Sequence, residues 1–140
     1  MLKWQFDSAR VHMDSKKLGI LGEKIAQKYL EKKGYQILDK NYSSKFVSGP
    51  KRGEIDIVAK KLDVFSFVEV KTLEDSGEPS SAISPEEKFN LVKKRKIMKM
   101  AESWLIEKKI PLDSKWQIDV ISIKINLGDK KAKICYFPNV

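Results

Sequence analysis

The sequence contains one cysteine and one histidine in 140 residues, and these two shortages exclude several classes of protein. Cys135 has no partner for an internal disulfide, which argues against a disulfide-stabilised secreted scaffold and favours a cytoplasmic chain with a buried thiol. His12 stands alone near the N-terminus and supports neither a catalytic triad nor a zinc site. The chain also lacks zinc-finger spacing, a glycine-rich phosphate loop and an RNA-binding aromatic signature.

Long apolar runs are missing as well. No stretch approaches the roughly 18 consecutive apolar residues that a membrane span needs, and residues 1–14 lack the apolar centre and cleavage site of a secretory signal. We therefore expect no membrane partner and a cytoplasmic location. The length suits a single domain, residues 1–140. Within it, residues 1–13 either dock on the body or form an N-terminal extension.

Positive charge, in contrast, is plentiful. Lysine and arginine number 28 against 19 acidic residues, which gives a net charge of +9. Such an excess favours a polyanionic partner, with nucleic acid ahead of an anionic membrane. Solubility alone is the competing explanation, because basic surfaces are common. The basic residues are spread along the chain, which favours a charged face of a folded domain over a disordered arm.

Apolar periodicity and turn residues predict two helices and five strands. The first helix starts at Asp14 or Ser15, runs to Lys33 and stops at Gly34. The second helix starts at Ser84 and Pro85 and runs to about Lys109. The predicted strands are residues 35–42, 54–60, 64–72, 116–125 and 131–137. The order α-β-β-β-α-β-β predicts the α/β (α+β) class, with a mixed central sheet flanked by helices.

Charged side chains interrupt two neighbouring apolar strands. Because side chains alternate faces along a strand, Glu69 and Lys71 share one face. If the strands pair as an antiparallel hairpin, Asp56 lies next to Glu69. Buried unpaired charges each cost several kcal/mol, and a divalent cation such as Mg²⁺, which prefers oxygen ligands, would offset the repulsion between the two carboxylates. One interpretation of the pattern is therefore a catalytic metal site in which Lys71 orients water or holds a phosphate oxygen.

An alternative needs no catalysis. Alternation on a half-exposed strand often produces same-face ion pairs, so Glu69 and Lys71 could form a surface salt bridge with Asp56 a solvated neighbour. Spacing alone leaves both interpretations open.

Longer motifs point to a known family. Asp56, twelve further residues and then Glu69-Val70-Lys71 resemble the PD-(D/E)XK motif of restriction-endonuclease-like nucleases. The segment LGILGEKIAQKYLEKKGYQILDKNY, followed by GEIDIVA, FVEVK, a lysine-rich helix with A-x-x-W-L, and QIDVISI, resembles the YraN-like family. That family is described as distantly related to archaeal Holliday junction resolvases. The resemblance covers about residues 18–125.

The resemblance implies a restriction-endonuclease-like fold and a role for each matching residue. Asp56 and Glu69 would bind Mg²⁺ or Mn²⁺, with the carbonyl of Val70 as a further candidate ligand, and Lys71 would be the catalytic lysine. Glu23 matches a helix glutamate that completes the acidic site in resolvase-like members. Without the family, a solvated helix acid is the simpler interpretation of Glu23. The resemblance also leaves a homodimer as one option.

The sequence departs from the family pattern at some points. The loop before Gly53 and the segment before the second helix are longer than expected, and Thr72-Leu73 follows the catalytic lysine where the family often has an arginine. These differences concern the approach of substrate more than the metal site.

Two basic clusters are candidates for contacts with nucleic acid, and we expect that nucleic acid to be DNA. The cluster in the loop before Gly53 is Lys51 and Arg52. The cluster on the second helix is Lys93, Lys94, Arg95 and Lys96, followed by Lys99. Lysine and arginine contacts with phosphates fix position and make binding steeply salt-dependent. A solvated helix face is the alternative for the second cluster.

Three functional hypotheses follow. The first is a Mg²⁺- or Mn²⁺-dependent endonuclease that hydrolyses DNA, including branched or damaged DNA. The second is a nucleic-acid-binding module with little or no activity. The third is a structural or adaptor protein whose basic charge is incidental. The complete set of Asp56, Glu69 and Lys71 favours the first, because pure binding has no need of buried acids.

Overall fold

A computed structural model describes residues 2–3, 14–44, 53–75 and 91–140 of the chain. The elements, in chain order, are β1 (Leu2–Lys3), α1 (Ser15–Lys32), β2 (Gln36–Tyr42), β3 (Ile55–Lys61), β4 (Val64–Glu74), α2 (Leu91–Glu107), β5 (Trp116–Asn126) and β6 (Lys131–Phe137). The predicted order α-β-β-β-α-β-β is confirmed, and β1, which the sequence did not predict, precedes it. The start predicted for the second helix lies outside the described residues.

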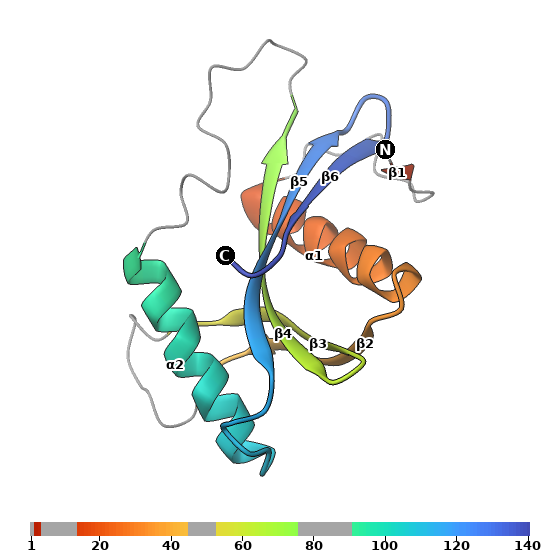
Figure 1. The fold of residues 1–140 in the computed structure, drawn as a ribbon. Coiled ribbons are helices and arrows are strands. Elements are labelled where there is room, and N and C mark those ends of the chain that lie inside the picture. Colours follow the sequence, from red (N-terminus) through yellow and green to blue (C-terminus); the bar gives the residue numbers. More distant parts are fainter. Residues whose placement is uncertain (1, 4–13, 45–52, 76–90) are drawn as a thin grey trace.

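All six strands belong to one mixed sheet, in the order β1-β6-β5-β4-β3-β2 (Figure 1). The central strands β4 and β5 pair in parallel over ten residues, from Phe65 opposite Trp116 to Glu74 opposite Ile125. The other neighbouring strands are antiparallel. Parallel neighbours need a crossover connection, and α2 lies in the connection between β4 and β5.

Each helix packs on its own face of the sheet. Leu21, Ile25 and Leu30 of α1 share a buried cluster with Val68 of β4 and Ile121 of β5. On the other face, α2 packs through residues that include Ile97, Trp104 and Leu105, against strand residues that include Phe65, Phe67 and Ile118. Consecutive residues of β4 therefore point into different clusters, as the period of two requires.

Local signals set the limits of α1. The Asp14 side chain accepts a hydrogen bond from the backbone N–H of Lys17 at 2.8 Å, which is an N-cap. At the other end Gly34 has φ +93°, and the N–H groups of Gly34 and Tyr35 donate to the carbonyls of Glu31 and Leu30. This Schellman pattern needs a left-handed residue after the helix, which glycine provides without strain.

A second glycine sets how closely α1 approaches the sheet. A Cβ atom built on Gly22 would lie 1.9 Å from Oγ1 of Thr72, on β4. Only a residue without a side chain fits between the helix and the strand at this point. The neighbouring residue, Glu23, is thereby held close to β4.

Within the described residues, no helix is both long enough and apolar enough to cross a membrane.

We predict that Gly22→Ala lowers the free energy of unfolding by about 1–3 kcal/mol, because overpacking forces the helix and strand apart. The matched control is Gly19→Ala on the same helix, where an added Cβ meets nothing within 4 Å. That change should raise stability by roughly 0.5–1 kcal/mol through helix propensity. Urea unfolding followed by circular dichroism measures both. Combining Gly22→Ala with Thr72→Ala should recover part of the loss; equal effects of the two glycine changes would contradict the close-contact explanation.

Candidate active site between α1, β3 and β4

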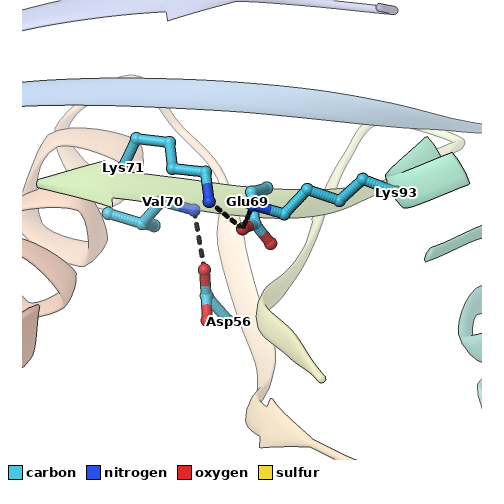
Figure 2. Close-up of polar contacts among 5 residues, drawn as sticks. All are labelled: Asp56, Glu69, Val70, Lys71 and Lys93. Carbon is cyan, nitrogen blue, oxygen red and sulfur yellow. Dashed lines mark hydrogen bonds and ion pairs between the residues drawn. The ribbon is translucent and has the colours of Figure 1, made fainter. Parts of the chain in front are cut away.

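Asp56 and Glu69 lie on neighbouring antiparallel strands. Ile57 of β3 is paired with Val68 of β4, so the preceding residue of β3, Asp56, comes level with Glu69. The two strands diverge here, and Oδ2 of Asp56 accepts a hydrogen bond from the backbone N–H of Val70 at 2.7 Å (Figure 2). The hairpin geometry predicted from alternation is therefore present. The carboxylate of Asp56 occupies the place that a strand carbonyl would otherwise take.

Two lysines form ion pairs with the Glu69 carboxylate. Oε1 of Glu69 lies 3.0 Å from Nζ of Lys71 and 3.3 Å from Nζ of Lys93, and Figure 2 shows the two ammonium groups arriving from β4 and α2. The same-face ion pair of Glu69 and Lys71 thus exists, but the strand is not exposed: Glu69 is only 9% accessible. The interpretation of this pair as a solvated surface bridge is wrong.

A second group of acids lies beside Asp56. Carboxylate oxygens of Glu23, Glu54 and Asp56 all lie within 4.8 Å of one another. The side-chain amide of Asn41 donates to Glu23 at 3.2 Å and to Glu54 at 3.0 Å. Glu23 comes from α1 and Asn41 from β2, whereas Glu54 directly precedes the strand that carries Asp56, so two further segments converge on the start of β3.

Asn41 was not predicted from the sequence. Its φ of +51° is in the left-handed region, which asparagine tolerates better than most residues. The one signal in the sequence was an Asn at the end of a predicted strand, a position where strand propensity disfavours it. Its hydrogen bonds to two carboxylates partly offset their repulsion.

Burial of the site and the neighbouring acids shift the pKa of Asp56. The pKa of its carboxyl is raised to about 8, first because the group is buried and then because the charge of Glu69 opposes ionisation. The N–H of Val70 acts in the other direction by stabilising the charged form, while Glu23 and Glu54 raise the pKa further. Asp56 is therefore an acid that resists ionisation at neutral pH unless a positive charge is supplied.

The pKa values of Lys71 and Lys93 are shifted in opposite directions. Burial lowers the pKa of Lys71, but its contacts with Lys93 and the Glu69 carboxylate outweigh that effect, and the net shift is upward. The pKa of Lys93 is lowered, first by burial and then by the neighbouring Lys71. Of the two, Lys71 is thus the more firmly charged.

Within the described part of α2, the other predicted basic residues do not take part in the ion pairs of Glu69. Within α2, Lys94 is half-buried, whereas Arg95 and Lys96 are exposed. Lys51 and Arg52 lie outside the described residues. Gly53, which follows them, contacts α2, because a Cβ on Gly53 would lie 3.7 Å from Cβ of Lys96. The end of the basic loop therefore returns to the basic helix.

The fold and the site together define a mixed α+β domain with a partly buried acid-and-lysine site on two neighbouring strands. Comparison with known sequences assigns the chain to a family. Residues 22–123 match the model of the family described as "Uncharacterised protein family UPF0102". The chain belongs to this family, which is the YraN-like family that its sequence motifs resemble.

Several bacterial relatives agree with that placement. A UPF0102 protein of Alkaliphilus oremlandii is 37% identical over 127 residues, covering 89% of this chain and 97% of the relative. One from Campylobacter jejuni is 42% identical over 106 residues, covering 76% of this chain and 82% of the relative. One from Campylobacter fetus is 39% identical over 108 residues, with coverage of 77% and 84%.

We predict that Asp56→Asn stabilises the cation-free protein at high pH. The pKa of Asp56 is about 8 in the folded chain and roughly 3.9 in an unfolded one. Between these values the folded state binds the extra proton, so rising pH removes stability from the wild type, and above about 8 the full penalty is present. The variant should gain free energy of unfolding, relative to the wild type, from pH 5 to about pH 9, measured by urea unfolding with a chelator.

Asp63→Asn is the control for this prediction. Asp63 is exposed and its pKa is lowered by the hydrogen bond and charge of Lys115, so its loss should not stabilise the protein at any pH. A gain for Asp56→Asn that is the same at pH 5 as at high pH would show that the effect is not ionisation.

Proposed function

We propose that this protein is a divalent-cation-dependent endonuclease that hydrolyses phosphodiester bonds in DNA, including branched or damaged DNA as in resolvase-like enzymes. The observation that carries the proposal is the raised pKa of Asp56 among Glu23, Glu54 and Glu69, with the Lys71 ammonium beside them. A half-buried carboxylate that neighbouring acids repel reduces stability, and such perturbed groups cluster at functional sites. The family's resemblance to restriction-endonuclease-like nucleases supports the same conclusion.

The donor set fits Mg²⁺ or Mn²⁺. Both are hard cations that prefer oxygen ligands, and Mg²⁺ is usually held by one or two carboxylates together with water. Glu23 and Asp56 would hold the ion, with Glu54 close enough to join them. Glu69 and the carbonyl of Val70 remain the further ligands that the family pattern implies. When bound, such an ion supplies Lewis-acid stabilisation of phosphate charge and lowers the pKa of water.

The protein's own residues then account for the rest of the reaction. Hydrolysis joins a water oxygen to phosphorus and breaks one ester P–O bond; the water gives up a proton and the departing oxygen gains one. Lys71, held by Glu69 at 3.0 Å, places a fixed positive charge where negative charge develops on the phosphate oxygens. Lys93 adds a second ammonium from α2. Arg95 and Lys96, exposed on the same helix, bind phosphates farther from the site.

A second candidate is a nucleic-acid-binding module with little activity. One observation favours it: the Glu69 carboxylate is paired with two lysines, and among the described residues it is not part of the group whose oxygens lie within 4.8 Å of one another. A site used only for binding could retain this ion pair. Catalysis is what distinguishes the two candidates.

We predict that the purified protein cleaves DNA with Mg²⁺ or Mn²⁺, and that Asp56→Asn and Lys71→Gln each lower the rate by at least about 100-fold, the loss typical of removing a group that stabilises developing charge. Four-way junctions, flaps, single strands and duplexes are the substrates, with cleavage followed on denaturing gels. Equal binding by wild type and variants would show that the loss concerns the chemical step.

Asp63→Asn and Lys115→Gln are the matched controls, because this acid and lysine also form a 3.0 Å ion pair but are 69% and 72% exposed. Both controls should cleave like the wild type. Salt-dependent binding without cleavage under either cation would contradict the endonuclease and support the binding module.

A further inference from the structure

The face of the sheet that carries Glu69 extends beyond α2. The cluster that α2 forms on this face includes Phe65 and Phe67 of β4 and Trp116 and Ile118 of β5, all in the first halves of their strands. Figure 1 shows the second halves of these strands continuing past α2, with α1 on the other side. Within the described residues, the α2 cluster does not include any residue of β4 after Phe67 or of β5 after Ile118.

Lysines occupy this continuation of the face. Ile123, Ile125 and Ala132 point into the α1 cluster, so alternation directs Lys124 of β5 and Lys133 of β6 to the opposite face. Lys131 of β6 has the same parity as Lys133, and both are exposed. With Lys71 of β4, the lysines of three adjacent strands share one face.

Two of these lysines lie directly opposite each other, an arrangement that β-sheets disfavour. Lys124 and Lys133 are direct partners in the β5–β6 ladder, and like charges directly opposite one another are destabilising. In the part of the chain that the structure describes, neither has a carboxylate within ion-pair distance. Counting only β4, β5 and β6 with the residue after β4, this face has from Glu69 onward four lysines against two acids, Glu69 and Asp75. Repulsion of this kind is relieved when an anion binds.

The lysines follow one another across neighbouring strands. Lys71 is paired with Ser122, two residues before Lys124, and Lys124 is paired with Lys133. Lys131 lies two residues from Lys133 and so on the same face. The lysines therefore form a series that runs from β6 to the site at Glu69 and Lys71.

We propose that Lys124, Lys131 and Lys133 form a phosphate-binding face that guides the DNA backbone to the site at Glu69 and Lys71. That the guided DNA reaches an active site rests on the proposed function, but DNA binding by this face does not require hydrolysis. Charge complementarity identifies the occupant, because the sugar-phosphate backbone is a regular polyanion. Lysines near a sheet edge also discourage pairing with other sheets, and that role predicts no effect on DNA affinity.

The test measures binding of the full chain to a fluorescein-labelled four-way junction and a labelled duplex by fluorescence anisotropy. A chelator prevents cleavage, and salt is varied between about 50 and 200 mM. Lys124→Gln combined with Lys133→Gln should weaken binding at least about tenfold and make the log–log salt slope less negative by about 1.8, or 0.9 for each lost phosphate contact.

Lys28→Gln combined with Lys32→Gln is the matched control, because it removes the same charge from exposed positions of α1. It should leave the slope within about 0.5 of the wild type, less than one phosphate contact. Lys124→Arg combined with Lys133→Arg should retain binding. Thermal melting checks that the glutamine variant is folded. Its stability should not fall, because the substitution removes the repulsion between two opposed lysines. Equal slopes for the two glutamine pairs, or no DNA binding by the wild type, would overturn the proposal.

The outcomes for this face and for the nuclease are separable. Binding that depends on Lys124 and Lys133 without cleavage in Mg²⁺ or Mn²⁺ supports the face and contradicts the endonuclease. Cleavage that is unaffected by the double glutamine variant, with unchanged binding, supports the endonuclease and contradicts the face.

Discussion

Parallel pairing of β4 with β5 is the constraint on which the other features of this molecule depend. Two parallel neighbours cannot be joined by a tight turn, so the chain must leave the sheet after Glu74 and return at Trp116. The returning segment includes α2, which covers the first halves of both strands. Helix α1 covers the opposite face, so β4 is buried on both sides at its centre. Glu69 and Lys71 lie where this double cover ends.

That position explains how charged groups are tolerated in a central strand. Glu69 is buried enough to strengthen its attraction to Lys71 and Lys93, since electrostatic interactions grow as water is excluded. Asp56, one strand away, has the hydrogen bond from Val70 but forms no ion pair with a lysine or arginine of the described chain. Positive charge is thus concentrated on one carboxylate while the neighbouring acids repel one another. The proposed binding of a cation and of DNA rests on this imbalance.

Much of this arrangement could be predicted from the sequence because it depends on local rules. Asp14 and Gly34 fix the ends of α1, and alternation in EIDIVAK and FVEVK correctly placed Asp56 level with Glu69. The contributions of Glu23, Asn41 and Lys93 could not be derived in this way, since each depends on contacts between distant segments. Glu23 was suggested only by the family resemblance; its location depends on the absence of a side chain at Gly22.

The irregular edge of the sheet has a consequence for self-association. Strand β2 lies at the end of the strand order, and its pairing with β3 shifts register between Ile37 and Asp39. Two residues beyond the shift, Asn41 adopts a left-handed backbone conformation. Another strand can extend a sheet only along a regular row of backbone donors and acceptors, and this edge does not offer one. If two copies of the chain associate, the irregular edge of β2 therefore disfavours joining them by continuing the sheet from that strand.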